Sequence, residues 1–492
     1  MFSFLKKKVD QSPIFLYNTL SKTKEEFKAI SGKKVRMYTC GPTVYDYAHI
    51  GNLRAYVFAD TLRRTLEYAG MQVKQVINIT DVGHLAQDSD DGEDKMTSAL
   101  KREGKELTIP NMKLLGEEYT SLFIEDLKML NVGMPFVFPR AINHISEQIA
   151  FISSLFEKGY AYKTTDGMYF DTAKFPSYGS LGSSEVGRIA SSLSAQARVV
   201  ANPEKHDQRD FALWKFDSTL GFEAPWGKGF PGWHIECTAM ATKYLGKSFD
   251  IHTGGIDHIA IHHNNEIAQA ESVSGKKFVH YWMHGEFITI EGKRIGKSEG
   301  NAIRLYQLRE HGVTPTAYRY LLLTAHYRSL LNFTWDAASS AQTALQRAQR
   351  MFADFPRKNK GHVVSLYQKK FETAINDDLN MPAAIAVMWE LLKDDSVTSV
   401  DKRATILNFD RVFGLGFGAE SLSESSKVSV TALSDIPPAI ALLVGEREEA
   451  RGAKNWAHAD ELRSSIEGQG FTLEDAPDGP IVRKAPGESP IH

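Results

Sequence analysis

The sequence predicts an α/β protein in which a doubly wound parallel sheet is followed by a region made of helices. The first observation is a β-prone run at 35–38, then a turn rich in glycine and proline, then a helical pattern from Gly51 to the stop at Gly70. The second is the apolar run 76–80, which is typical of a buried parallel strand. The third is a helical pattern with few prolines or glycines from 326 to about 417.

Composition indicates a globular protein of several domains. A length of 492 residues corresponds to about three domains by the usual size of a domain. The formal net charge of −2 supplies no general attraction for nucleic acid, so such a partner would need local basic patches. Only two cysteines exclude a disulfide-dense scaffold. Without an apolar run long enough for a signal peptide or a membrane span, we expect a cytoplasmic protein that does not contact membranes.

Two glycine-containing loops carry groups that suit phosphate. In the first, His49, Gly51 and Asn52 lie at the predicted start of a helix, where free N–H groups and the helix dipole favour anions. A capped helix behind an ordinary polar loop would show the same four-residue pattern. In the second loop, at 291–301, Arg294 and Lys297 lie between flanking glycines.

Together the loops resemble the HIGH and KMSKS signatures of class I aminoacyl-tRNA synthetases. Further stretches from near Tyr17 to near Arg483 resemble the cysteinyl-tRNA synthetase family, in the family's order: TCGPTVYDYAHIGNLR, NITDVGH, DFALWK, PWGKGFPGWHIECTAM, FDIHTGGIDHIAIHHNNEIAQ, HYRSLLNFT and KNWAHADELR. Two departures stand out. The second signature reads RIGKS, in which Arg294 changes the geometry of the charge and Gly296 loosens the loop, and the first ends in Asn52 in place of histidine.

The resemblance implies a Rossmann-like catalytic domain that is interrupted by an insertion and followed by helices. The expected order is a first half of the catalytic domain at 1–158, a connective-peptide insertion at 159–231, the second half at 232–287, a signature-loop and stem-contact region at 288–325, a helical bundle at 326–417, a serine-rich linker at 418–436, and a small α/β anticodon-end domain at 437–492. Within the last domain we expect one helix over about 438–467 and a strand-like tail. The acidic loop at 87–95 is expected to be solvated.

Four residues form a candidate metal site. His262 and Glu266 are four apart on a predicted helix and so share one face. Alone, Cys40 and Cys237 would more often be buried thiols, and a His/Glu pair would more often decorate a helix surface. The resemblance implies that all four bind one zinc ion. Nearby histidines are expected to have supporting roles: His234, His258 and His263.

The resemblance also implies the reaction: L-cysteine and ATP form an adenylate, with Mg²⁺ expected, and the cysteine passes to tRNA(Cys) on a monomeric enzyme. Zinc would supply a discrimination between thiol and hydroxyl that shape alone gives poorly. Thr80, Trp233 and His252 match positions that line the cysteine pocket. The implied ATP-binding residues are Gly41, Thr43, His49, Gly51, Asn52, Gly255, Asp257 and Lys297, and the implied catalytic residues are His49, Asn52, Arg294 and Lys297.

A basic stripe near the C-terminus is the candidate tRNA surface. Arg447, Arg451 and Lys454 are spaced i, i+4 and i+7, and Trp456 is close by. A solvated helix face with ion pairs is an equally good interpretation. Two other functions remain open: a ligase that couples cysteine to a small-molecule amine, and a tRNA-binding protein without activity. The tRNA-binding protein without activity is disfavoured, because His49, Lys297 and the four candidate metal ligands are all present.

Overall fold

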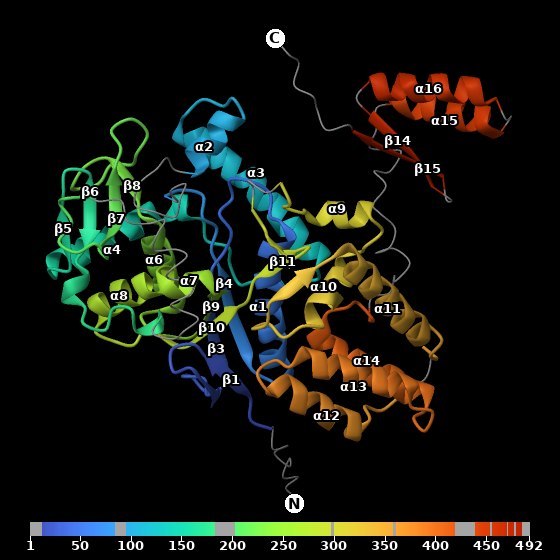
Figure 1. The fold of residues 1–492 in the computed structure, drawn as a ribbon, viewed down its shortest axis with the longest axis horizontal. Coiled ribbons are helices and arrows are strands. Elements are labelled where there is room, and N and C mark those ends of the chain that lie inside the picture. Colours follow the sequence, from blue (N-terminus) through green and yellow to red (C-terminus); the bar gives the residue numbers. More distant parts are fainter. Residues whose placement is uncertain are drawn as a thin grey trace, which may run out of the picture. The chain divides into compact units, whose positions relative to one another are not determined.

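The computed structural model describes residues 12–83, 95–182, 202–296, 300–357, 361–418, 438–452, 455–469, 471–476 and 479–484. The chain forms two compact units, residues 1–418 and 419–492 (Figure 1). Lys297, Lys454, nearly all of the acidic loop at 87–95 and nearly all of the predicted linker at 418–436 lie outside the described residues. Among the described helices, none is both long enough and apolar enough to cross a bilayer.

A four-stranded parallel sheet forms the centre of the first unit, which confirms the predicted α/β class. Its order is β10 (Val279–Gly285), β9 (Phe249–Gly255), β3 (Lys34–Thr39) and β4 (Gln72–Ile77). Helix α1 (Ile50–Tyr68) connects β3 to β4, and α8 (His262–Ser274) connects β9 to β10. In Figure 1 the sheet lies between α1 on one side and α6 (Trp233–Leu245) and α8 on the other. This layering buries both faces of the strands, as their apolar sequences require.

Shorter elements complete the part of the fold that contains β3 and β4. The hairpin of β1 (Phe15–Asn18) and β2 (Thr23–Glu26) precedes the sheet. Helices α2 (Lys95–Arg102) and α3 (Ile109–Met129) follow β4. Thr108 caps α3, because its side chain accepts a hydrogen bond from the backbone N–H of Asn111.

An antiparallel sheet is inserted between the halves of the parallel sheet. Helix α4 (Ile145–Glu157) leads into β5 (Ala161–Lys163), β6 (Gly167–Phe170), β7 (Phe211–Phe216) and β8 (Gly229–Pro231), which pair in chain order. A buried apolar cluster, which includes Trp214 and Phe170, packs the insertion against Ile235 of α6 and Ala268 of α8. Its strands agree with the strand-like texture that the sequence shows in this region.

The segment after β10 holds the second signature loop. Strand β10 ends at Gly285. Strand β11 (Ile288–Ile290) then joins β12 (Lys293–Arg294) and β13 (Leu331–Phe333) in a separate sheet. Helices α9 (Leu305–Glu310) and α10 (Pro315–Leu323) follow the loop.

The helical bundle comprises α11 (Trp335–Ala353), α12 (Ser365–Asn376), α13 (Met381–Lys393) and α14 (Ser399–Phe413). The expectation of helix from 326 onward was wrong for the first residues, because β13 lies there. A buried ion pair attaches α10 to α1: Arg319 Nη2 lies 2.6 Å from Asp60 Oδ2. Arg319 also donates to the carbonyl of Phe413 at the end of α14. These contacts hold the helix that carries the first signature against the bundle.

The second unit packs two helices on a hairpin of β14 (Phe471–Ala476) and β15 (Gly479–Lys484). The prediction of one helix over 438–467 was wrong, because α15 (Pro438–Gly452) ends and α16 (Trp456–Gly468) begins anew. Asn455 explains the break: its side chain accepts from the backbone N–H of His458 and caps α16. The small core of this unit contains Ile440, Val444 and Ile466.

Candidate active site

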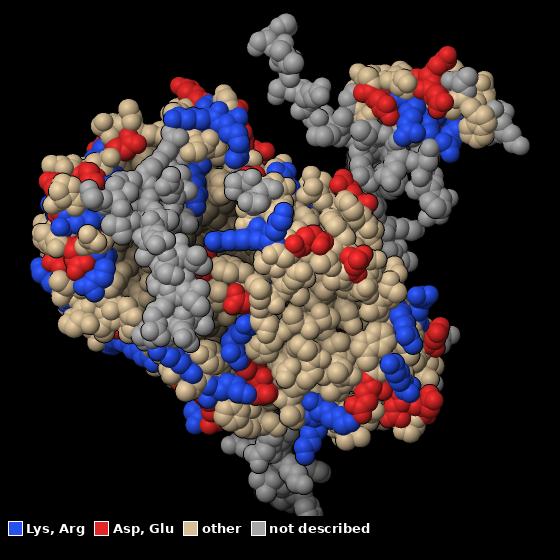
Figure 2. All heavy atoms as spheres, viewed as in Figure 1, with Lys and Arg blue, Asp and Glu red and all other residues tan. Residues whose placement is uncertain are grey.

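A cleft of about 1110 Å³ opens where β3 and β9 end and α1 begins. Crevices beyond the carboxyl ends of parallel strands are where such sheets bind ligands. On the face shown in Figure 2, acidic and basic side chains of the first unit are interspersed. Most of the predicted site residues line the cleft: Cys40, Gly41, Thr43, His49, Gly51, Asn52, Thr80, Trp233, Cys237, Gly255, Asp257, His262 and Arg294.

The first signature forms the N-terminal cap of α1. His49 Nδ1 accepts from the backbone N–H of Asn52 at 3.2 Å, and the side chain of Asn52 accepts from the backbone N–H of His49 at 3.1 Å. This capping box fixes both side chains at the positive end of the helix. The hydroxyl of Tyr318 donates to the carbonyl of Ile50 at 2.7 Å, so α10 supports the same turn.

Close packing joins the two signatures. A Cβ atom on Gly51 would lie 2.7 Å from Cδ1 of Ile295, so the side chain of Ile295 in the second loop packs directly against the first turn of α1. The side chain of Asn301 bridges the base of this loop, donating to the carbonyl of Arg294 and accepting from the N–H of Gly296, both at 3.0 Å. Sequence reasoning gave no role to Asn301 or Tyr318, since one occupies a polar loop and the other an apolar helix pattern.

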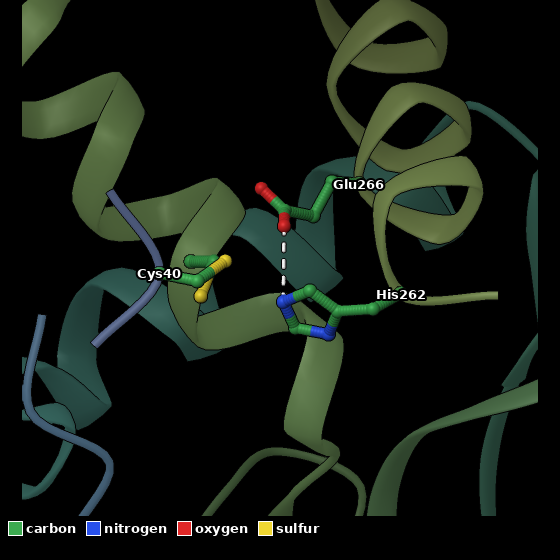
Figure 3. Close-up of side chains that lie close together, drawn as sticks. Cys40, His262 and Glu266 are labelled. Atoms are coloured by element: carbon green, nitrogen blue, oxygen red, sulfur yellow. Dashed lines mark ion pairs between the residues drawn. The ribbon is translucent and has the colours of Figure 1, made fainter. Parts of the chain in front are cut away.

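The four predicted metal ligands lie together at the other end of the cleft. Each can place one ligand atom so that all lie within 4.8 Å of one another, and all four residues are buried. Cys40 follows β3, Cys237 lies in α6, and His262 and Glu266 are one turn apart in α8. In Figure 3 the side chains of Cys40, His262 and Glu266 point toward one another, with His262 Nε2 3.0 Å from Glu266 Oε1.

The arrangement fits a zinc ion. Two sulfurs, an imidazole nitrogen and a carboxylate oxygen are the ligand types that zinc prefers. Glu266 Oε1 is buried and, among the described residues, has no partner in hydrogen-bond geometry, although His262 Nε2 is within ion-pair distance. Lone pairs that converge without an aligned hydrogen between them are what a cation would satisfy.

A second combination, Cys40, His252, His263 and Glu266, meets the same distance criterion. We favour the predicted set for one reason. Cys40, Cys237 and His262 line the cleft, whereas His252 and His263 are fully buried and do not. A metal that meets a substrate has to face the cleft.

Three further histidines contact the predicted ligands from behind. His252 Nε2 lies 3.0 Å from Glu266 Oε2, His234 Nδ1 lies 2.9 Å from His262 Nδ1, and His263 Nε2 lies 3.4 Å from Cys40 Sγ. Such outer partners orient metal ligands. The Nε2 atom of His252 is directed to Glu266 and not into the cleft. The predicted contact of His252 with the substrate therefore stays a prediction.

The surroundings of the two thiols in the cluster shift their pKa values in opposite directions. Burial acts to raise the pKa of Cys40, but the hydrogen bond with Cys237 and the nearby imidazoles outweigh it and hold this pKa well below its usual range. Burial, reinforced by Cys40, raises the pKa of Cys237. For His262, burial lowers the pKa, but the negative Cys40 and Glu266 raise it to about 10.

A polar network lies between the metal cluster and Thr80. The hydroxyl of Thr80 and the amide of Asn78 both donate to Glu236 Oε1, and Asn78 Oδ1 accepts from the N–H of Gly41 at 2.8 Å. Burial raises the pKa of Glu236 well above its usual range. The ring of Trp233 packs 4.5 Å from that of His262. Sequence reasoning missed Asn78 and Glu236, although both lie inside the motifs that carried the resemblance.

Gly255 and Asp257 lie where β9 passes into the short helix α7 (Asp257–Ala260). The side chain of Asp257 is half exposed in the cleft, which leaves its carboxylate accessible to a ligand. The neighbouring His258 also lines the cleft.

The predicted tRNA residues do not form one exposed stripe. The side chain of Arg447 on α15 is only 2% exposed and pairs with Glu448 at 2.6 Å. Arg451 is partly exposed, with 33% of its side-chain surface accessible. Trp456 is exposed and begins α16, on the far side of the break that the sequence did not reveal.

Comparison with known proteins agrees with this architecture. Residues 26–343 match the model of the "tRNA synthetases class I (C) catalytic domain", and residues 370–395 match the "DALR domain". The chain is similar in fold to a methionyl-tRNA synthetase from Mycobacterium tuberculosis solved with methionyl-adenylate, with a TM-score of 0.54 and 14% identity over 78% of this chain and 90% of that one.

Curated relatives match almost the whole chain. It is 46% identical to cysteine–tRNA ligase 1 of Burkholderia lata, over 95% of this chain and 96% of the relative. It is 37% identical to the cysteine–tRNA ligase of Treponema denticola, over 94% of this chain and 97% of the relative. Identity of this extent, together with the catalytic-domain match, shows that the chain belongs to the cysteine–tRNA ligase family of class I aminoacyl-tRNA synthetases.

Proposed function

We propose that this chain activates L-cysteine with ATP as cysteinyl-adenylate and transfers the cysteine to the 3′ end of tRNA(Cys), using a zinc ion to select the thiol. The observation that carries this proposal is the composition of one cleft. The N-terminus of α1 provides phosphate-binding groups on one wall, and a Cys₂HisGlu cluster lies on another.

The zinc ion is held by Cys40, Cys237, His262 and Glu266, and when bound it supplies a soft Lewis acid that favours sulfur over oxygen. Thr80 and Trp233 enclose the side chain of the amino acid, and His252 orients Glu266 from behind. Discrimination against serine needs such help, because shape alone separates near-isosteres by roughly a hundredfold or less.

In the first step the substrate carboxylate attacks the α-phosphorus of ATP and pyrophosphate leaves. The side chains of His49 and Asn52 and the backbone N–H of Gly51 bind phosphate oxygens, while Gly255 and Asp257 accommodate the adenosine. Lys297, supported by Arg294, neutralises the charge that grows on pyrophosphate, with Mg²⁺ as the expected counter-ion. In the second step a terminal ribose hydroxyl of tRNA displaces AMP. Catalysis is thus mainly positioning and charge stabilisation.

The test is cysteine-dependent ATP–pyrophosphate exchange, followed by charging of tRNA, with full-length protein whose zinc content has been measured. We expect one zinc per chain, exchange with cysteine, exchange with serine weaker by far more than a hundredfold, and charging of tRNA(Cys). Exchange that is absent, or equal with serine, would contradict the proposal.

Coupling of cysteine to a small-molecule amine would use the same cleft. Two observations favour tRNA as the acceptor. The chain has a second unit of two helices and a hairpin, and it matches its curated relatives over nearly its whole length. A protein that activates cysteine but charges no tRNA would support the small-molecule acceptor.

A further inference from the structure

A line of hydrogen-bonding side chains runs from Cys40 into the core behind the cleft. Cys40 Sγ lies 3.4 Å from His263 Nε2, and His263 Nδ1 lies 2.7 Å from His284 Nε2. His284 Nδ1 lies 2.8 Å from the hydroxyl oxygen of Thr19. Each imidazole therefore uses both of its ring nitrogens within this line.

The members come from separate elements that the backbone fixes in place. His263 lies in α8, and His284 lies in β10 opposite Gly254 of β9. Thr19 directly follows β1, and its backbone N–H donates to the carbonyl of Trp282 at 2.8 Å. The two histidines are at most 4% exposed, so little water can compete for their nitrogens.

A metal-bound sulfur allows only one placement of the hydrogens in this line. A neutral imidazole has one N–H and one lone pair. Because a ligating cysteine is a thiolate without a hydrogen, His263 has to carry its hydrogen on Nε2. Its Nδ1 then accepts from Nε2–H of His284, and Nδ1 of His284 accepts from the hydroxyl of Thr19. The donors thus all point toward Cys40.

We propose that Thr19, His284 and His263 are positioning residues that present Cys40 to the metal as an oriented, hydrogen-bonded thiolate. Thr19 selects the tautomer of His284, and His284 selects that of His263. Without the hydroxyl, His284 can place its hydrogen on Nδ1, and His263 then loses the donor that fixes its own hydrogen toward sulfur. The inference rests on the metal site of the proposed function and is independent of tRNA charging.

Thr19→Val is the central test, because it removes the hydroxyl from the far end of the line and nearly preserves shape. We expect the purified variant to release zinc to a colorimetric chelator about tenfold faster than the wild type does. Mutation of a residue that hydrogen-bonds to a metal ligand typically weakens metal binding by about 10–100-fold, and this estimate takes the lower value. Thr19→Ser should restore the wild-type rate. The matched control is Ser21→Ala in the same turn, whose hydroxyl contacts only Asn18 and Thr23 among its described partners and should leave the rate unchanged.

A spectroscopic arm distinguishes orientation of sulfur from general loosening of the fold. In the cobalt-substituted protein, the sulfur-to-cobalt charge-transfer band should shift in Thr19→Val and return in Thr19→Ser. His284→Leu should release zinc faster still, by about 10–100-fold. His284→Gln, which keeps an N–H donor for His263, should lie between His284→Leu and the wild type.

The outcomes separate two failures. If wild-type protein holds no zinc, the proposed metal site itself is wrong. If wild-type protein holds zinc but Thr19→Val changes neither its release nor the cobalt band, the positioning role is wrong, whether or not His284→Leu folds. Faster release in Ser21→Ala as well as Thr19→Val would also overturn it, because the effect would then belong to the turn.

Discussion

The two ends of the cleft are built in different ways. At the metal end, side chains from the end of β3, from α6 and from α8 converge, and all four candidate ligands are buried. At the nucleotide end, the groups lie at the positive end of α1 or in the second loop and are partly or fully exposed side chains such as His49, Asn52 and Arg294. Separating a thiol from a hydroxyl needs fixed, desolvated groups. Phosphate, by contrast, is bound well by charge and helix-end dipoles near water.

The sharpest way to break this comparison is to remove a ligand at the metal end. Cys237→Ala should lose most of the bound zinc and lower cysteine-dependent exchange by more than about 100-fold, which exceeds the usual cost of losing an outer partner. Elemental analysis and exchange assays measure the two effects. A variant with full zinc would remove Cys237 from the ligand set. Thr242→Ala, on the same helix α6 but outside the cluster, is the control and should behave as wild type.

The sequence predicted the parts of each end that depend on local pattern. His262 and Glu266 share a helix face because α8 has regular geometry, and the cap formed by His49 and Asn52 follows from strand, loop and helix order. The outer histidine contacts could not be predicted. They depend on how β9, β10 and α8 pack, and no spacing along the chain encodes that His284 meets His263.

At the nucleotide end, Lys297→Ala should lower the rate of adenylate formation by roughly 10²–10³-fold. Removing one group that stabilises transition-state charge lowers kcat by this amount in other enzymes. Cysteine binding should change much less, because the lysine acts as pyrophosphate departs. Arg294→Ala should cost less, since its guanidinium lies over the ring of Phe287 at the rim, 5.8 Å from the centroid. The neighbouring Lys293→Ala is the control. Unchanged pre-steady-state adenylate formation in Lys297→Ala would contradict its role.

Fold prediction failed where tertiary contacts decide secondary structure. The short strand β13 lies in a segment that reads as helix, because it pairs with β11 in parallel register. The break between α15 and α16 depends on one capping residue, Asn455, in a sequence that is otherwise helical. That break also places Trp456 on a different helix from Arg447 and Arg451, and Arg447 is itself buried.

The second unit provides a third region, which should affect neither end of the cleft. Trp456→Ala should raise KM for tRNA about tenfold, because stacking on an exposed aromatic ring contributes about 1–3 kcal/mol per base. Exchange without tRNA should be unchanged. Arg451→Ala should have a smaller effect that weakens with salt. Equal charging kinetics for wild type and Trp456→Ala would show that this tryptophan does not contact tRNA.

The smallest expected effect concerns the support of the nucleotide end by α10. Tyr318 and Tyr320 are two residues apart on α10, and both hydroxyls are hydrogen-bonded. Tyr318 donates to the carbonyl of Ile50 in the first signature, whereas Tyr320 accepts from the indole of Trp389 within the bundle. Phenylalanine at either position should lower the free energy of unfolding by a similar amount, about 0.5–1.5 kcal/mol.

Only Tyr318→Phe should also alter ATP binding. Loss of the Tyr318 hydroxyl frees the first turn of α1, which carries the proposed phosphate-binding side chains of His49 and Asn52. KM for ATP should therefore rise about three- to tenfold, equivalent to about 0.7–1.4 kcal/mol. KM for cysteine and zinc content should stay constant, because the metal cluster is held by β3, α6 and α8. Denaturant unfolding and exchange kinetics on the two variants measure these quantities. Equal KM values for ATP in Tyr318→Phe and Tyr320→Phe would mean that the capping box of His49 and Asn52 holds the turn without help from α10.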